Sequence, residues 1–282
     1  MGILTKSRLP ESLHFRFYSC QEGMTVGDLC SLSWNDVIKA YAIIVGFAPT
    51  SVRMWPVTAS EFDLPYAVRI DPYDVYAWPE LECDIGRPLV SGKAVNVPLE
   101  QLKEIGEQPK GRTDPHLDEN ATATMDRLID EWQELSSFAE PEGFEPEGFE
   151  PEGPGRMYRV FDGHELQGKN IHAKDLRDLL GIEQPAANSL VQGIKLPTFD
   201  QTKEVCEKLQ CRPCDILSKN PPDYLARLCQ PDMKKLVVEY ATMKNLDESR
   251  ARLNVIEETL KPARSTGGKG ARLRAILKEL SA

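Results

Sequence analysis

Two kinds of hydrophobic pattern divide the chain. Between residues 24 and 105, short runs rich in β-branched and aromatic residues alternate with glycine, proline and other turn formers. This spacing predicts strands over residues 29–33, 40–47, 51–57, 66–70 and 94–97, and then a short helix from Pro98. Beyond residue 170 every periodic segment has helical spacing instead. The sequence therefore predicts an α+β multidomain protein, with a small β-barrel or sandwich followed by an all-α part.

Residues 176–193 have the pattern of two short helices joined by a tight turn. Leu176, Leu179 and Leu180 form one apolar face, and Gly181 follows at the corner, where glycine tolerates a positive φ. The second helix is expected to carry Ala186, Ala187 and Leu190 inward. Thr198 is the expected N-cap of the next helix.

Three further segments complete the predicted organisation. Residues 121–138 have the spacing of an acidic amphipathic helix, and the Pro-Glu-Gly-Phe-Glu repeat over 140–153 predicts an extended linker. Residues 225–260 predict a long helical stretch suited to dimerisation, followed by a basic segment with Arg264, Lys269, Arg272, Arg274 and Lys278. The predicted parts are residues 1–110, 111–155, 156–220 and 221–282.

Charge is distributed unevenly along the 282 residues. The net charge is −10, but residues 111–155 alone hold thirteen acidic and two basic side chains. Residues 231–282 hold eleven basic and seven acidic side chains. Because the acid is concentrated in the middle, the total charge does not exclude DNA as a partner of the C-terminal half.

The cysteines and the N-terminus indicate a cytoplasmic protein. Seven cysteines, an odd number with irregular spacing, predict reduced thiols, and no segment has the apolar length of a signal or a membrane span. Cys206, Cys211 and Cys214 lie close enough to suggest a metal or redox site, but Cys206 falls on the inward face of a predicted helix and a fourth ligand is missing. We therefore predict no metal and no cofactor.

The helical motifs resemble the XRE, phage-repressor family of helix-turn-helix domains. The resemblance rests on Leu-Arg-Asp-Leu-Leu-Gly-Ile from residue 176, Ser-Leu-Val-Gln-Gly-Ile-Lys-Leu-Pro-Thr from 189 and Lys-Leu-Gln-Cys-Arg-Pro-Cys-Asp-Ile-Leu from 208. It implies a recognition helix in the major groove of double-stranded DNA. Gln184, Asn188, Ser189 and Gln192 would face base edges, whereas Lys195 and Thr198 would contact phosphates. Since that helix contains no Lys or Arg, we expect modest affinity unless the protein is a dimer or the basic tail contributes.

The N-terminal motifs resemble the MazF/PemK-like toxins. They are Gly-Asp-Leu-Cys-Ser-Leu at 27–32, Ala-Ile-Ile-Val at 42–45, Val-Arg-Met-Trp-Pro-Val-Thr at 52–58 and Ala-Val-Asn-Val-Pro-Leu-Glu-Gln-Leu at 94–102. The resemblance implies an SH3-like barrel that cleaves single-stranded RNA without a metal, using an arginine and a threonine. Thr58 matches the threonine, and Lys39-Ala40 replaces the arginine-proline pair, so Lys39 and Thr58 are the candidate catalytic residues. Lysine does not reproduce the planar two-pronged contact of arginine.

These observations lead to three hypotheses. The first is a sequence-specific DNA-binding transcriptional regulator, related to toxin-antitoxin systems and expected to be a homodimer. The second is a MazF-like endoribonuclease toxin fused to a DNA-binding antitoxin-like domain and autoinhibited, with the acidic helix and linker masking its RNA groove. The third is a protein-interaction scaffold in which both domains bind proteins and the helical module therefore docks protein rather than DNA.

Overall fold

The computed structural model describes the chain in parts. These are Leu4, Leu13, Arg16–Phe17 and residues 23–48, 51–62, 64, 66–107, 119–138, 158–218, 223–228, 231–246 and 248–260. The expected linker at 140–153 and the basic segment after residue 260 lie outside the described residues. Contacts between Cα atoms divide the chain into two compact units. The first holds the strands, and the second holds the helices from residue 158 onward together with Trp34–Val37.

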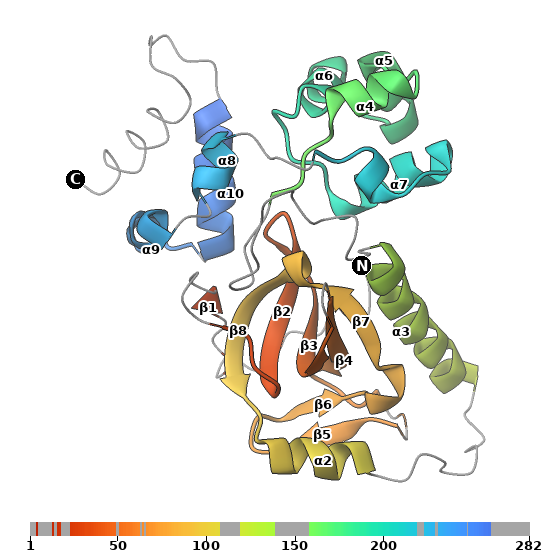
Figure 1. The fold of residues 1–282 in the computed structure, drawn as a ribbon, viewed down its shortest axis with the longest axis vertical. Coiled ribbons are helices and arrows are strands. Elements are labelled where there is room, and N and C mark those ends of the chain that lie inside the picture. The colour runs from red at the N-terminus through yellow and green to blue at the C-terminus, as the bar shows by residue number, and fades with distance from the viewer. Residues whose placement is uncertain are drawn as a thin grey trace. The chain divides into compact units, whose positions relative to one another are not determined.

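The first unit is built on an antiparallel sheet whose strands curl around a core (Figure 1). The hydrogen-bonded order is β1-β8-β2-β3-β4-β6-β5, and β7 also pairs with β4. The strands are β1 (Arg16–Phe17), β2 (Asp28–Trp34), β3 (Val37–Phe47), β4 (Ser51–Thr58), β5 (Val68–Ile70), β6 (Val75–Ala77), β7 (Cys83–Gly86) and β8 (Val90–Asn96). The expected α+β class is confirmed, with strands first and helices after them.

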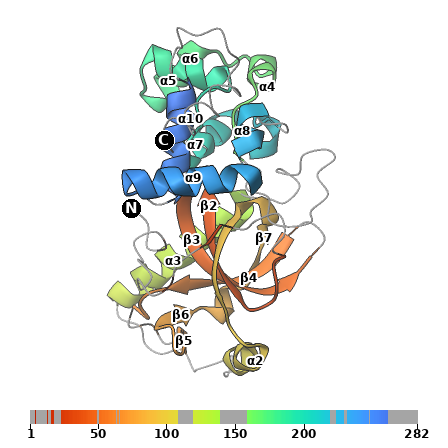
Figure 2. The same cartoon turned by 90° about the vertical axis from the view of Figure 1, so that its left-hand side faces the viewer.

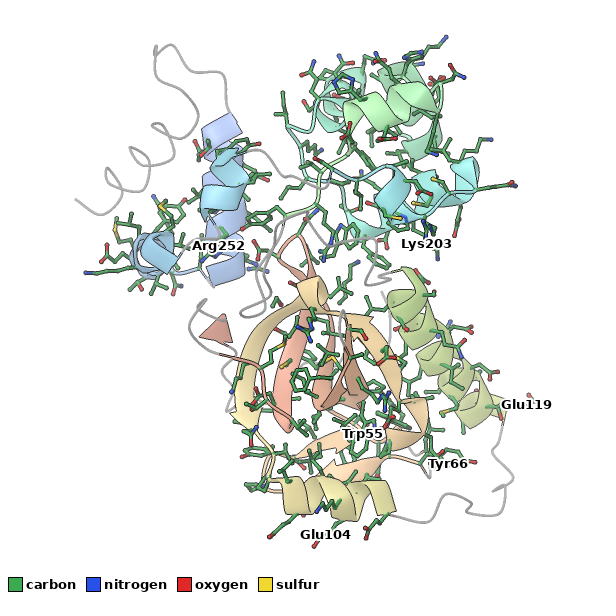
Figure 3. All side chains as sticks on the ribbon, in the orientation of Figure 1. Trp55, Tyr66, Glu104, Glu119, Lys203 and Arg252 are labelled. Atoms are coloured by element: carbon green, nitrogen blue, oxygen red, sulfur yellow. The ribbon has the colours of Figure 1, made fainter. Side chains whose placement is uncertain are left out.

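β4 organises the curl of this sheet. One edge of β4 pairs with β3, whereas the other pairs with β7 over Ser51–Met54 and with β6 at Val57 and Thr58. Trp55 of β4 is 93% buried, lies among the core side chains (Figure 3) and donates from Nε1 to Glu82 Oε2 at 2.9 Å. Because two strands share one edge of β4, the sheet changes direction there and encloses Trp55.

Two helices pack on the sheet. α2 (Leu99–Glu107) buries Leu102 and Ile105 in the same core as Trp55, while Glu104 points outward (Figure 3). α3 (Glu119–Phe138) is the predicted acidic helix, and it buries Leu128, Trp132 and Leu135. Trp132 Nε1 donates to the Leu81 carbonyl at 2.7 Å, and Ser136 Oγ donates to the Asp84 carbonyl at 3.1 Å. These bonds hold α3 beside β7.

The second unit is helical. Its helices are α4 (Gly163–Gly168), α5 (Ala173–Leu180), α6 (Gln184–Val191), α7 (Phe199–Leu209), α8 (Asp223–Leu228), α9 (Pro231–Lys244) and α10 (Glu248–Leu260). α9 and α10 cross steeply (Figure 2), and Met233, Val237 and Val255 pack with Tyr158 and Val160 in one core.

The predicted stretch over residues 225–260 is helical, but it is divided into the three helices α8, α9 and α10. Pro231 begins α9, where its missing N–H costs nothing, although the same residue would interrupt a continuous helix. Asn245 ends α9 in the left-handed region with φ 51°, and α10 begins at Glu248.

Gly27 lies at a position where both the backbone conformation and the close approach of Val97 require glycine, and this requirement can be tested. Gly27 has φ +95°, and a Cβ added there would lie 2.2 Å from the Val97 carbonyl oxygen. We expect Gly27→Ala to lower the free energy of unfolding by about 1–3 kcal/mol or more, since both the backbone and the contact are strained. Gly23→Ala is the control, because an added Cβ meets nothing within 4 Å. The free energies of unfolding of both variants are measured by urea denaturation, and equal values would contradict the prediction.

Candidate nucleic-acid interface

α5 and α6 are joined by a tight left-handed turn. Gly181 has φ 60° and ψ 29°, and its N–H donates to the Arg177 carbonyl at the end of α5. Leu176 is buried and Leu179 and Leu180 are half-buried on α5. On α6, Ala187 and Leu190 are fully buried. The predicted turn residue is confirmed, and so are the inward positions Leu176, Ala187 and Leu190, whereas Ala186 is only half-buried. The opposite side of α6 is exposed to solvent.

The exposed side of α6 presents carboxamide groups. Asn188 and Gln192 are exposed and Gln184 is half-buried. Gln184 Nε2 donates to Asn188 Oδ1 at 3.0 Å, so the two side chains one helical turn apart form a pair. This pairing leaves Gln184 Oε1 as an acceptor and the Asn188 amide hydrogens as donors.

Ser189 differs from its neighbours on α6. Its side chain is half-buried, and Oγ donates to the Pro185 carbonyl at 2.9 Å. The hydroxyl proton is therefore used inside the helix, and only oxygen lone pairs remain for an outside partner. The predicted base-facing set thus consists of the Gln184–Asn188 pair and Gln192, with Ser189 limited to accepting hydrogen bonds.

The loop after α6 carries the two predicted phosphate contacts. The N–H groups of Ile194 and Lys195 both donate to the Ser189 carbonyl, at 2.9 and 3.0 Å, and the Lys195 side chain is exposed. Thr198 is the N-cap of α7, as predicted, because its Oγ1 accepts from the Gln201 N–H at 3.1 Å. The Thr198 hydroxyl proton remains available for donation to an external oxygen.

Several basic side chains of the second unit are paired with carboxylates. Arg177 contacts Asp178 at 2.5 Å, Lys203 lies 3.8 Å from Glu207, and Arg212 lies 3.9 Å from Asp215. All of these pairs are at least partly exposed, so each contributes little to stability. They do reduce the positive charge offered to a polyanion, which leaves Lys195 as the cation of the loop between α6 and α7.

Residues 34–37, the turn between β2 and β3, belong to the second unit. The Trp34 ring meets Phe199 edge to face, with centroids 5.3 Å apart and an interplanar angle of 84°. The guanidinium carbon of Arg159 lies 4.6 Å from the Trp34 ring centroid. Burial lowers the pKa of Arg159 to about 9, and the ring face offsets part of the cost of burying the cation.

Asn35 and Trp34 also bind the backbone of this unit. Asn35 Oδ1 accepts from the Arg159 N–H at 2.7 Å, and Nδ2 donates to the Arg159 carbonyl at 3.0 Å. Asn35 Nδ2 and Trp34 Nε1 both donate to the Pro197 carbonyl, at 2.8 and 3.1 Å. Sequence reasoning missed these contacts because they join residues more than 120 positions apart. The only local signal was Asn35-Asp36, a dipeptide suited to a two-residue hairpin turn.

Lys39 and Thr58 are not brought to one site. Tyr41 pairs with Val57, so these two side chains share a face of the sheet. Lys39 lies two residues from Tyr41 and Thr58 lies next to Val57, and strand alternation therefore directs Lys39 and Thr58 to opposite faces. Thr58 is fully buried.

Further contacts also bear on the ribonuclease hypothesis. The Thr58 hydroxyl donates to the Ser60 carbonyl at 2.6 Å and accepts from Trp78 Nε1 at 2.9 Å. The acidic helix α3 contacts Leu81 and Asp84, on the β7 side of β4, whereas Lys39 belongs to β3 on the other side. None of these contacts supports a ribonuclease centre at Lys39 and Thr58.

The three neighbouring cysteines lie at the end of α7. Burial raises the pKa of the thiols of Cys206, Cys211 and Cys214, so these groups are protonated at neutral pH. Within the described ranges, no group of three or more His, Cys, Asp or Glu side chains is arranged to hold a metal ion. The helices described here also include none with the length and apolar content to cross a bilayer.

Three comparisons with known proteins, against family models, curated proteins and solved structures, find no match to this chain. The functional argument therefore rests on the residues described above.

Thr198 provides a test of the start of α7. Thr198→Ala removes the oxygen that accepts from the Gln201 N–H, and we expect a loss of about 1 kcal/mol in the free energy of unfolding. Thr198→Ser keeps that oxygen and serves as the control. Thermal and urea unfolding would contradict the capping role if the alanine and serine variants were equally stable.

Proposed function

We propose that the second unit binds double-stranded DNA and that the protein is a DNA-binding transcriptional regulator. In this proposal α5 and α6 form a helix-turn-helix of the phage-repressor type, with α6 as the recognition helix in the major groove. The curled sheet of the first unit is proposed to be an SH3-like barrel. The observation that carries the proposal is the hydrogen-bonded Gln184–Asn188 pair on the exposed side of α6.

The chemistry of this pair suits a base edge. Adenine presents an N6 donor and an N7 acceptor in the major groove. With Gln184 Nε2 bonded to Asn188 Oδ1, the free groups are the Gln184 Oε1 acceptor and the Asn188 Nδ2 donor, which complement that edge. The bond between the two side chains also restricts their rotation before DNA binds, which reduces the entropy lost on binding.

The charge around α6 supports weak non-specific binding. α6 itself contains no ionisable side chain, its N-cap Glu183 is exposed, and Lys195 is the exposed cation of the loop that follows. Few phosphate contacts release few counterions, so each copy of the unit would bind DNA with a shallow salt dependence. Pairing of two copies on one operator would double the contacts.

The proposal predicts separable effects of base and phosphate contacts. Selection from random duplexes supplies the preferred site, and binding is then measured over a range of salt concentrations. We expect Asn188→Ala to lower the preference for that site by about 1–3 kcal/mol without changing the salt slope. Lys195→Ala should weaken binding to all duplexes and reduce the slope by about 0.9.

Lys103→Ala is the control for these measurements, because Lys103 is an exposed lysine on α2 of the first unit. It should leave both the site preference and the salt slope unchanged. If the unsubstituted protein does not bind any duplex in a salt-dependent manner, or if Asn188→Ala binds all sites as the parent does, the proposed function is wrong.

A further inference from the structure

The end of the loop between α6 and α7 is held by a single backbone group. Pro197 is buried, and proline has no N–H, so its carbonyl is its only backbone hydrogen-bonding group. A buried carbonyl requires a partner. The partners are Asn35 Nδ2 at 2.8 Å and Trp34 Nε1 at 3.1 Å, both from the turn between β2 and β3.

Asn35 is chemically suited to this position. Its φ of 47° and the φ of 67° at Asp36 are those of a tight two-residue turn, a backbone that asparagine tolerates well. Its carboxamide accepts from the Arg159 N–H and donates to the carbonyls of Arg159 and Pro197. Both amide hydrogens are therefore used, and they tie the backbone at Arg159 to the end of the loop.

Trp34 fixes the residue on the other side of Thr198. Its ring packs edge to face on Phe199, the first residue of α7. Thr198 is thus flanked by Pro197, which is bonded to the turn, and by Phe199, which is packed on it. Lys195 precedes this anchor by two residues, and its backbone is fixed at its other end by the Ser189 carbonyl.

We propose that the turn at Trp34–Val37 is a positioning element for DNA binding, in which Asn35 and Trp34 hold the loop that presents Lys195 and Thr198 to the phosphates. This inference rests on the proposed DNA-binding function. According to this inference, the turn at Trp34–Val37 is required for the phosphate contacts although it does not itself contact DNA. Asn35 and Trp34 act through the loop and are not themselves contact residues.

The test compares two glycine variants of the full chain. Asn35→Gly keeps a residue that adopts positive φ but removes all three side-chain hydrogen bonds. Asp36→Gly changes the neighbouring turn residue, which bonds to Tyr158 Oη and not to Pro197. We expect Asn35→Gly to reduce the salt slope of duplex binding by about 0.9, as Lys195→Ala does, and Asp36→Gly to leave the slope unchanged.

The salt slope separates positioning from stability. Salt also changes folding stability by screening charges, so the slopes are compared over the salt range in which circular dichroism shows each variant to be fully folded. Over that range a reduced slope reports a lost phosphate contact and not a loss of stability. The double variant Asn35→Gly with Lys195→Ala should have the slope of either single variant, because both remove the same phosphate contact. Should Asn35→Gly not fold, Trp34→Phe replaces it, since it removes the Nε1 donor and keeps a ring against Phe199.

Three outcomes decide the inference. A reduced slope in Asn35→Gly or Trp34→Phe, with no further reduction in the double variant, supports it. A parental slope in these variants, or reductions that add in the double variant, overturns it and leaves the proposed function standing. Absence of salt-dependent duplex binding by the unsubstituted protein overturns the proposed function, and the inference with it.

Discussion

The buried carbonyl of Pro197 is the constraint on which the candidate interface depends. A buried carbonyl left without a partner costs about 1–3 kcal/mol, and proline offers the chain no N–H with which to form a local alternative. The chain satisfies the carbonyl with Trp34 and Asn35, whose own turn conformation is set by two residues with positive φ. These two hydrogen bonds fix the end of the loop before α7, together with the Thr198 cap and the bonds to the Ser189 carbonyl at the other end.

The positions of the charged side chains matter more for the candidate interface than the net charge of the chain. The net charge of −10 would repel DNA if it were spread evenly, and cations of the first unit are drawn into ion pairs, such as Arg69 with Asp71 and Asp74. In the second unit, α6 carries amides rather than charges, and Lys195 stands beside it. In the proposed DNA complex, such a surface would favour discrimination between bases over strong attraction to the DNA backbone.

The sequence predicted the features that depend on local pattern. Periodicity predicted the long strands and α3, and Gly181 predicted the turn after α5. Thr198 could be predicted as the N-cap of α7 because a threonine hydroxyl can accept from an N–H of the first helical turn. The strands β6 and β7 were missed because three or four residues display little alternation, whereas the equally short β5 was found only as part of the longer apolar run over 66–70. The break at Pro231 was overlooked although proline is a strong signal. The bonds from Asn35 to Arg159 and Pro197 were beyond sequence reasoning, because no local pattern encodes contacts between distant segments.

The most direct measurement is a titration of the ¹⁵N-labelled full chain with its selected duplex, followed through the side-chain amide resonances. Alanine variants assign the signals of Gln184 and Asn188, and the side-chain amide of Gln101, which donates to the Asp71 carbonyl in the first unit, is the internal reference. The account predicts large shifts for Gln184 and Asn188 and none for Gln101. DNA binding that leaves the Gln184 and Asn188 resonances unchanged would contradict it.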